Sequence, residues 1–192
     1  MPELFVVLGQ KLGLPVTLSD APRHYFAKFK KDNGEWTNVE VTSFGGQTDE
    51  HYIQKLDIPQ LAMDNKLWLQ TLTHKQSAVL LFEPLEEYYH ASNQPDRLLA
   101  LTDLILKFDP KNVSVMIYRG DAFAQLSDDR YLRYGAPNHI PRSMLADYQH
   151  LESQNQQMFA QAMSLGWQPE TAQHRMKYMQ SIQQAQSRQG GG

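Results

Sequence analysis

Two short runs of alternating apolar and polar residues flank an Asp-Asn-Gly turn early in the chain. The first run covers residues 24–30 and the second covers residues 36–42, with side chains such as Ala27 and Val39 at alternate positions. A period of two residues is typical of strands, and Asp-Asn-Gly between two such runs favours a tight β-hairpin. From residue 77 onward the period becomes helical, so the chain is predicted to be α+β, with strands preceding most of the helices.

A helix is predicted in front of the hairpin. Apolar residues recur there at helical spacing: Leu4, Phe5, Leu8 and Leu12. Gly13 follows as a natural C-terminal stop. After the hairpin the sequence has little regular pattern as far as residue 75, apart from a short helix predicted near residues 58–64. Residues 1–75 are therefore predicted to form one N-terminal unit.

Amphipathic helices separated by proline-bearing turns are predicted over residues 76–168. Two units look repeated, and the first closes at Pro110 after a span of about 34 residues. The expected packing positions of the first unit are Phe82, Leu85, Tyr89, Leu98 and Ile105, and those of the second are Met116, Gly120 and Phe123. Gly120 is expected where two helices approach closely, because it has no Cβ. A further helix is predicted over residues 141–152.

The end of the chain, residues 169–192, is rich in glutamine and is predicted to hold a C-terminal helix and a frayed tail. Two repeats are too few to fold alone, so the helical region is expected to pack against the N-terminal unit.

The charge distribution argues against nucleic acid as a partner. The chain has 192 residues, with 18 Lys and Arg against 21 Asp and Glu, and neither half is basic. Nucleic-acid binding generally needs a basic stripe that releases counter-ions.

The longest apolar runs are far shorter than the roughly 20 residues that cross a bilayer, so no membrane span is expected. No basic leader precedes the first helix, although a front segment could have held a signal peptide.

His24 and Glu40 are the candidate catalytic residues. His24 opens the first predicted strand and Glu40 lies in the second. A nucleophile needs an imidazole to take its proton and a third group to orient that imidazole, and a hairpin can present the last two side by side. The sequence contains no cysteine, so a thiol nucleophile is absent from it.

Two registers of the hairpin remain open. A three-residue loop of Asp32, Asn33 and Gly34 pairs Phe26 with Glu40, which makes His24 and Glu40 diagonal neighbours on one face. A two-residue loop of Asn33 and Gly34 pairs Phe26 with Val41 instead. That register puts the imidazole and the carboxylate on opposite faces and forbids the pair.

Three segments resemble the transglutaminase-like superfamily of papain-type folds. They are Leu-Phe-Val-Val-Leu-Gly-Gln-Lys-Leu-Gly-Leu-Pro at residues 4–15, Ala-Pro-Arg-His at residues 21–24 and Asn-Val-Glu-Val-Thr-Ser at residues 38–43. With the helical pattern behind them, the chain is similar to bacterial transglutaminase-like proteins that carry a C-terminal tetratricopeptide region. The resemblance implies His24 as the base, Glu40 as its orienting partner and Asn38 as a second candidate for that role.

In that family the catalytic cysteine opens the helix that ends in the Gly-Leu-Pro turn. Counting back from Pro15 places it about three residues before Met1, outside this chain. Two explanations stay open. Either the intact protein has a cysteine upstream of Met1, or the domain is degenerate and serves as a binding scaffold.

Two functions follow as expectations. The chain as given is expected to act by binding a protein or peptide through the helical region, and an intact protein would catalyse acyl transfer or hydrolysis through a cysteine, His24 and Glu40. No cofactor and no metal are expected, because none of the other histidines has a partner at metal-ligand spacing. Self-association is expected through apolar surface on Phe5 and Leu8.

Overall fold

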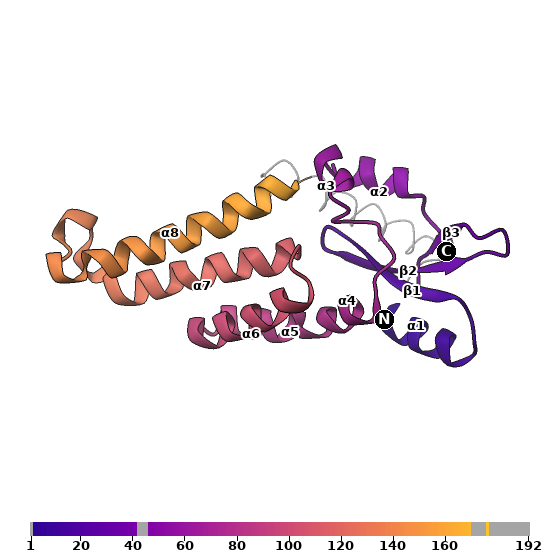
Figure 1. Cartoon of the computed structure of the whole chain (residues 1–192), viewed down its shortest axis with the longest axis horizontal. Coiled ribbons are helices and arrows are strands. Elements are labelled where there is room, and N and C mark those ends of the chain that lie inside the picture. Colours follow the sequence, from indigo (N-terminus) through magenta and orange to yellow (C-terminus); the bar gives the residue numbers. More distant parts are fainter. Residues whose placement is uncertain (1, 42–45, 170–175, 177–192) are drawn as a thin grey trace.

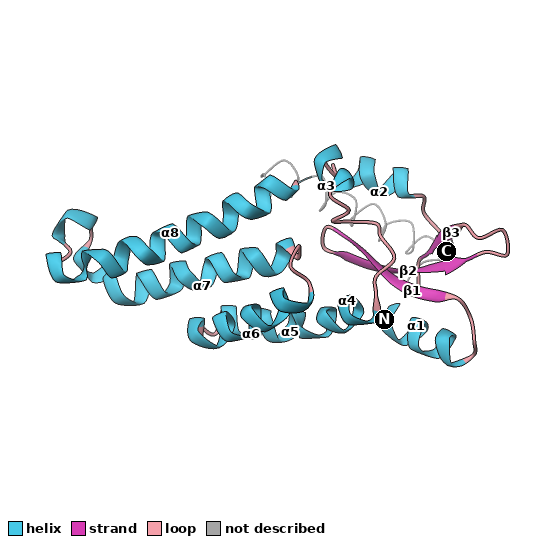
Figure 2. Ribbon diagram, viewed as in Figure 1, coloured by secondary structure: helices cyan, strands magenta, loops and turns pink. Residues whose placement is uncertain are grey.

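The computed structural model describes residues 2–41, 46–169 and 176 and confirms the α+β class (Figures 1 and 2). A three-stranded antiparallel sheet, in the order β1-β2-β3, forms the N-terminal part together with short helices. Longer helices follow and extend away from the sheet as a row of antiparallel elements. The finer assignments, to a transglutaminase-like unit over residues 1–75 and a tetratricopeptide-like region over residues 76–168, stay predictions.

The hairpin between β2 (His24–Lys30) and β3 (Trp36–Val39) adopts the three-residue loop. Ala27 pairs with Val39 and Lys30 with Trp36, a register that continues to Phe26 opposite Glu40. Gly34 lies in the left-handed region, with φ of +86°, and its amide donates to the carbonyl of residue 31. Glycine adopts this conformation without strain, which explains why the wider loop forms here.

Two elements of this region were not predicted from the sequence. Strand β1 (Val16–Ala21) pairs with β2 from Val16 opposite Phe29 to Ala21 opposite His24, and helix α2 (Asp49–Lys55) follows the hairpin. The ladder of β3 ends at Val39, earlier than the predicted run, whose last residue lies outside the described part of the chain. The short helix predicted near residues 58–64 is present as α3 (Gln60–Asp64).

One face of the sheet packs against helix α1 (Pro2–Lys11), which is present as predicted. Val6 of this helix contacts a cluster that includes Leu18 and Ala27. A Cβ on Gly9 would lie only 2.7 Å from Cγ2 of Val16, so the helix and β1 are in close contact. The apolar stripe of the helix instead faces outward: Leu4, Leu8 and Leu12 are 53%, 52% and 79% exposed.

The opposite face of the sheet is covered by α2 and α3, which lie above it in Figure 1. Phe26 is fully buried there and packs in one cluster with Tyr52 of α2 and Ala62 of α3. Met116 and Ala162, from the long helices, belong to the same cluster. The sheet and the helical row therefore share a core, as the sequence analysis expected.

The helical row begins at residue 74. Its elements are α4 (His74–Val79), the 3₁₀ turn η1 (Leu80–Phe82), α5 (Glu83–Ala91), α6 (Pro95–Phe108), α7 (Val113–Tyr131), the 3₁₀ turns η2 (Leu132–Tyr134) and η3 (Pro137–His139), and α8 (Arg142–Leu165). The helix predicted over residues 141–152 thus starts as expected but continues to Leu165. The predicted C-terminal helix and tail lie almost wholly outside the described residues.

Most of the predicted packing positions in the row are buried, and two are not. Leu98, Ile105, Met116 and Phe123 lie in the core, and a Cβ on Gly120 would approach Cε2 of Phe159 to 2.8 Å. Phe82 and Leu85 are more than a third exposed. The expectation for these two was wrong, because Phe82 lies in η1 and the inner face of α5 runs through Glu86 rather than Leu85. Tyr89, which was also predicted, is partly buried and packs on the core.

Candidate acid-base site

The hairpin register brings His24 and Glu40 together on one face of the sheet. Phe26 stands opposite Glu40 when the ladder of β2 and β3 is continued by one residue, so His24 is the diagonal neighbour of Glu40. Nε2 of His24 lies 2.7 Å from Oε1 of Glu40. Of the two registers left open by the sequence, the structure therefore has the one that permits the pair.

The two partners differ in burial in the way that a base and its orienting group require. The His24 side chain is 37% exposed, whereas the Glu40 side chain is 8% exposed. With Nε2 donating its proton to the carboxylate, Nδ1 is left as the unprotonated ring nitrogen. A fixed tautomer with one free ring nitrogen is the form in which an imidazole accepts a proton.

Tyr52 is a third member of the site that the sequence analysis missed. Its hydroxyl donates to the same oxygen of Glu40 in a short hydrogen bond. Its ring stacks on Phe26 with centroids 4.8 Å apart and lies 5.6 Å from the His24 ring. Since two donors converge on one carboxylate oxygen, Glu40 is held in place from both the sheet and helix α2.

A local signal for this helix is present in the sequence. Thr48 caps α2 by accepting a hydrogen bond from the amide of His51, and Asp49 and Glu50 follow in the first turn. A threonine followed by acidic residues is a common helix start. It would have predicted α2, although not the contact between Tyr52 and Glu40.

Asn38, the second candidate for the orienting role, does not contact His24. Its amide nitrogen donates to Oδ1 of Asp49 at 2.7 Å and to the carbonyl of Gln47 at 2.8 Å. The buried ammonium of Lys28 also donates to Asp49, at 3.0 and 3.1 Å. Asn38 therefore helps to fix the start of α2 against the sheet, two residues away from the position that faces the imidazole.

Helix α1 packs on the other face of the sheet from this pair. Val6 contacts Ala27, and side chains of a strand alternate between faces, so His24 points away from α1. Pro2 and Val6 of its first turns are buried, and Val6 belongs to the cluster on that face. In the resembled family the nucleophile opens this helix, and here that helix begins on the side away from the imidazole.

Other nucleophiles and ligands are absent from the site within the part of the chain that the structure describes. Ser19 is fully buried with no hydrogen-bond partner for its hydroxyl, and Ser43 lies outside the described residues. No group of three or more His, Asp or Glu residues in residues 2–41, 46–169 and 176 is arranged to hold a metal ion. The same residues contain no helix of sufficient length and apolarity to cross a bilayer.

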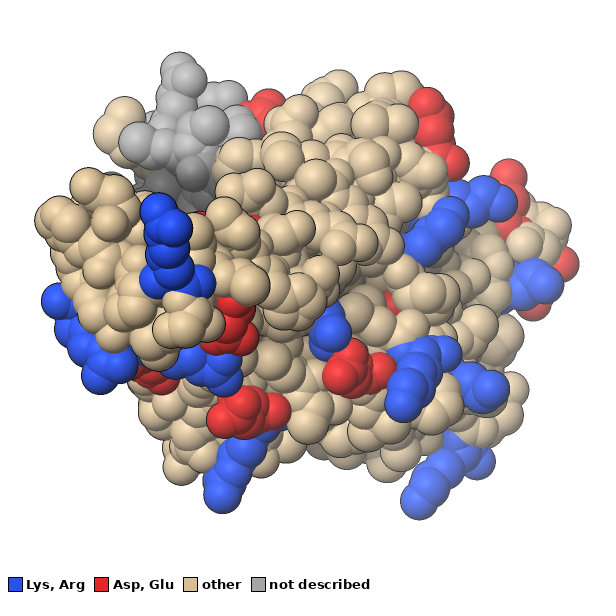
Figure 3. Space-filling view, turned by 60° about the vertical axis from the view of Figure 1, so that its left-hand side comes forward, with Lys and Arg blue, Asp and Glu red and all other residues tan. Residues whose placement is uncertain are grey.

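The visible face in Figure 3 carries acidic and basic side chains close to one another, with no continuous basic surface.

Comparison with known proteins does not identify the chain: no family model, no curated protein and no solved structure matches it.

Proposed function

We propose that His24 is the general base of an acyl-transfer or hydrolytic site and that Glu40 orients it. The observation that carries this proposal is the 2.7 Å contact between Nε2 of His24 and Oε1 of a carboxylate that is itself buried and held by Tyr52. A carboxylate hydrogen-bonded to one ring nitrogen fixes the tautomer and the orientation of an imidazole, so that the other nitrogen faces the group whose proton it takes.

The chain has no cysteine, so the nucleophile that His24 would serve is not a thiol of this chain. Proton transfer to a positioned imidazole typically accelerates such reactions by about 10²–10⁴-fold. An imidazole prepared in this way also reacts directly with activated esters, since its free nitrogen can attack the carbonyl. This reactivity makes the proposal testable on the chain as it is.

The experiment measures release of p-nitrophenolate from p-nitrophenyl acetate by the purified chain. We expect His24→Gln and Glu40→Gln each to lower the rate by at least about tenfold, since the first removes the base and the second removes its charged partner. His139→Gln is the matched control, because His139 is exposed and its Nδ1 lies 3.1 Å from a backbone carbonyl oxygen, that of Tyr134, rather than from a carboxylate. Equal rates for the wild type and His24→Gln would refute the proposal.

A second candidate function is the binding of a basic amphipathic helix from a partner protein. It is supported by an apolar stripe on η1 and α5, where Leu81, Leu85 and Tyr88 are 67%, 37% and 58% exposed. Their spacing of four and three residues places them on one helical face. The exposed Glu87 lies beside Tyr88 on α5, so a partner carrying Lys or Arg around apolar residues would complement this surface.

A fluorescent helical peptide of leucine and lysine is the probe for this second function. We expect Leu85→Asp to weaken binding by at least about tenfold, measured by fluorescence anisotropy, because it puts a charge into the apolar stripe. Leu132→Asp is the control, since Leu132 is 72% exposed on η2, outside the stripe. The proposal fails if both variants bind the peptide with equal affinity. It also fails if a peptide of leucine and glutamate binds as tightly as the peptide of leucine and lysine.

A further inference from the structure

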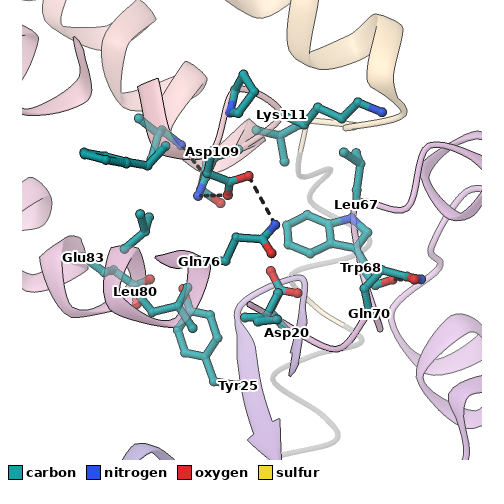
Figure 4. Close-up of a pocket in the computed structure, with 18 of the residues that line it drawn as sticks. Asp20, Tyr25, Leu67, Trp68, Gln70, Gln76, Leu80, Glu83, Asp109 and Lys111 are labelled. Carbon is teal, nitrogen blue, oxygen red and sulfur yellow. Dashed lines mark hydrogen bonds between the residues drawn. The ribbon is translucent and has the colours of Figure 1, made fainter. Parts of the chain in front are cut away.

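A cavity of about 510 Å³ lies where the end of the sheet meets the helical row. Its wall includes Asp20 at the end of β1, Tyr25 of β2, Glu83 of α5 and Asp109 just after α6 (Figure 4). Glu86 of α5 lines the same cavity. Asp20 and Tyr25 alternate with the residues that face α2, so they project from the face opposite to His24 and Glu40. The cavity is therefore separate from the acid-base site.

The wall of the cavity carries four carboxylates without a cationic partner. In the described residues, no Lys or Arg forms an ion pair with Asp20, Glu83, Glu86 or Asp109. The contacts that two of them make are neutral. Asp109 accepts from the side-chain amides of Gln76, at 3.4 Å, and Asn112, at 3.1 Å, and Glu83 accepts from the hydroxyl of Tyr25.

The cationic side chains that line the cavity are on its rim. Arg23, Lys66, Lys75 and Lys111 are all exposed. In Figure 4, Lys111 extends away from Asp20 and Asp109 rather than between them. Among the described residues, no basic side chain is therefore paired with the carboxylates inside the cavity.

Asp20 is the most informative of the four carboxylates. Its carboxyl group is buried and points into the cavity, and its Oδ1 is closed off from solvent with no hydrogen-bond partner. Buried polar oxygens in folded proteins are nearly always hydrogen-bonded, so an unpartnered carboxylate oxygen needs an explanation. Burial, and then repulsion from Asp109, raises the pKa of Asp20 to about 7. Burial, followed by the charges of Glu83 and Glu87, raises the pKa of Glu86 to about 7 as well.

The chemistry of the wall favours an organic cation over a metal ion. Where the structure describes the chain, no three acidic or histidine side chains are close enough together to coordinate a metal. An organic ammonium is larger and reaches acceptors that are spread over a wall. The aromatic residues Tyr25, Trp68 and Tyr118 line the same cavity, and aromatic rings attract organic cations and pack on carbon chains.

We propose that this cavity binds an organic amine carrying primary ammonium groups, with Asp20 as its principal anchor and the Glu83 and Glu86 pair as a second acidic pole. An ammonium at Asp20 gives Oδ1 the donor that it lacks and separates the charges of Asp20 and Asp109. The aliphatic part of the amine packs on the aromatic wall between the two poles. The inference does not depend on the function proposed for His24.

Isothermal titration calorimetry with the diamine cadaverine at about pH 8, where Asp20 is largely ionised, tests the proposal. We expect the wild type to bind cadaverine and Asp20→Asn to bind at least about tenfold more weakly, because the anchor has lost its charge. Asp32→Asn is the matched control, since it removes one acidic group from the exposed hairpin loop and should leave the affinity unchanged. Glu83→Gln should also weaken binding.

Three outcomes would overturn the proposal. The first is that cadaverine does not bind the wild type, or binds Asp20→Asn and the wild type equally. The second is that the neutral diol of the same chain length binds as tightly as cadaverine, which would mean that the cavity selects the carbon chain. The third is that magnesium chloride displaces cadaverine stoichiometrically at low concentration, which would mean that the site prefers a metal ion.

Discussion

Replacing Asp20 by asparagine is expected to change the pH dependence of stability in a defined direction. Burial and Asp109 raise the pKa of Asp20 from 3.8 to about 7 in the folded chain. The folded state therefore holds this proton more tightly than the unfolded state does. Between about pH 4 and about pH 7 the wild type loses stability as pH rises, and above about pH 7 this loss is complete.

The size of the effect follows from the pKa change. A rise from 3.8 to about 7 corresponds to about 4 kcal/mol as an upper limit, at about 1.36 kcal/mol for each pH unit. The asparagine side chain cannot titrate, so Asp20→Asn should gain stability relative to the wild type as pH rises, by up to about 4 kcal/mol between about pH 4 and about pH 8. A constant offset of about 1–3 kcal/mol can accompany it, because the amide also needs hydrogen-bond partners.

Urea denaturation followed by circular dichroism at several pH values measures this difference directly. The other carboxyl groups whose pKa is raised, Glu83, Glu86 and Asp121, are present in both proteins. Their contributions cancel in the difference, apart from any coupling to Asp20. Asp32→Asn serves as the exposed control and should show a flat difference. If the stability difference between Asp20→Asn and the wild type is the same at all pH values, Asp20 is not buried as an unpartnered acid and the reasoning is wrong.

Three further substitutions test the packing around the sites, each by urea denaturation. Tyr52→Phe should lower the free energy of unfolding by about 1 kcal/mol, because it deletes the hydroxyl that donates to Glu40, and no change would mean that this bond contributes nothing. Gly166→Ala should lower the free energy of unfolding by more than about 2 kcal/mol, since Gly166 has φ of +108° and a Cβ there would lie 2.4 Å from the amide nitrogen of Ala62. An unchanged free energy of unfolding would contradict this close contact. Leu98→Ala should lower the free energy of unfolding by about 2–5 kcal/mol because Leu98 is fully buried. A loss below about 1 kcal/mol would mean that the neighbouring side chains fill the space that Leu98 leaves.

The sequence predicts the hairpin but leaves two registers for it. Local turn chemistry permits both loops, and only the rest of the molecule distinguishes them. Phe26 is fully buried against Tyr52, and Lys28 is buried against Asp49, contacts made by a helix that lies well beyond the hairpin. The register is therefore fixed by tertiary packing, which no window of sequence around the turn contains.

Burial of α1 shows a different limit of sequence reasoning. The apolar spacing correctly predicts a helix, but the stripe of leucines faces outward and the helix packs through Val6 and Gly9. Glycine adds nothing to a hydrophobic pattern, yet its lack of a side chain allows close contact with Val16. Strand β1 was not predicted for a related reason. It includes the polar residues Thr17, Ser19 and Asp20, so its hydrophobic pattern is weak, and it forms by pairing with β2.

The alternation of side chains along β2 links the two proposed sites to one core. His24 faces Glu40 and Tyr52, whereas the next residue, Tyr25, faces the cavity, so each site depends on the same register. A slip of one residue would move Glu40 to the side of α1 and turn Val39 toward the polar contacts around Lys28. The apolar packing of Val39 against the cluster that holds Val6 and Ala27 opposes that slip, since Val39 would leave this cluster. The imidazole and carboxylate are thus held together by packing on both faces of the hairpin: Phe26 packs on Tyr52 on their own face, and Val39 packs in the cluster of Val6 on the other.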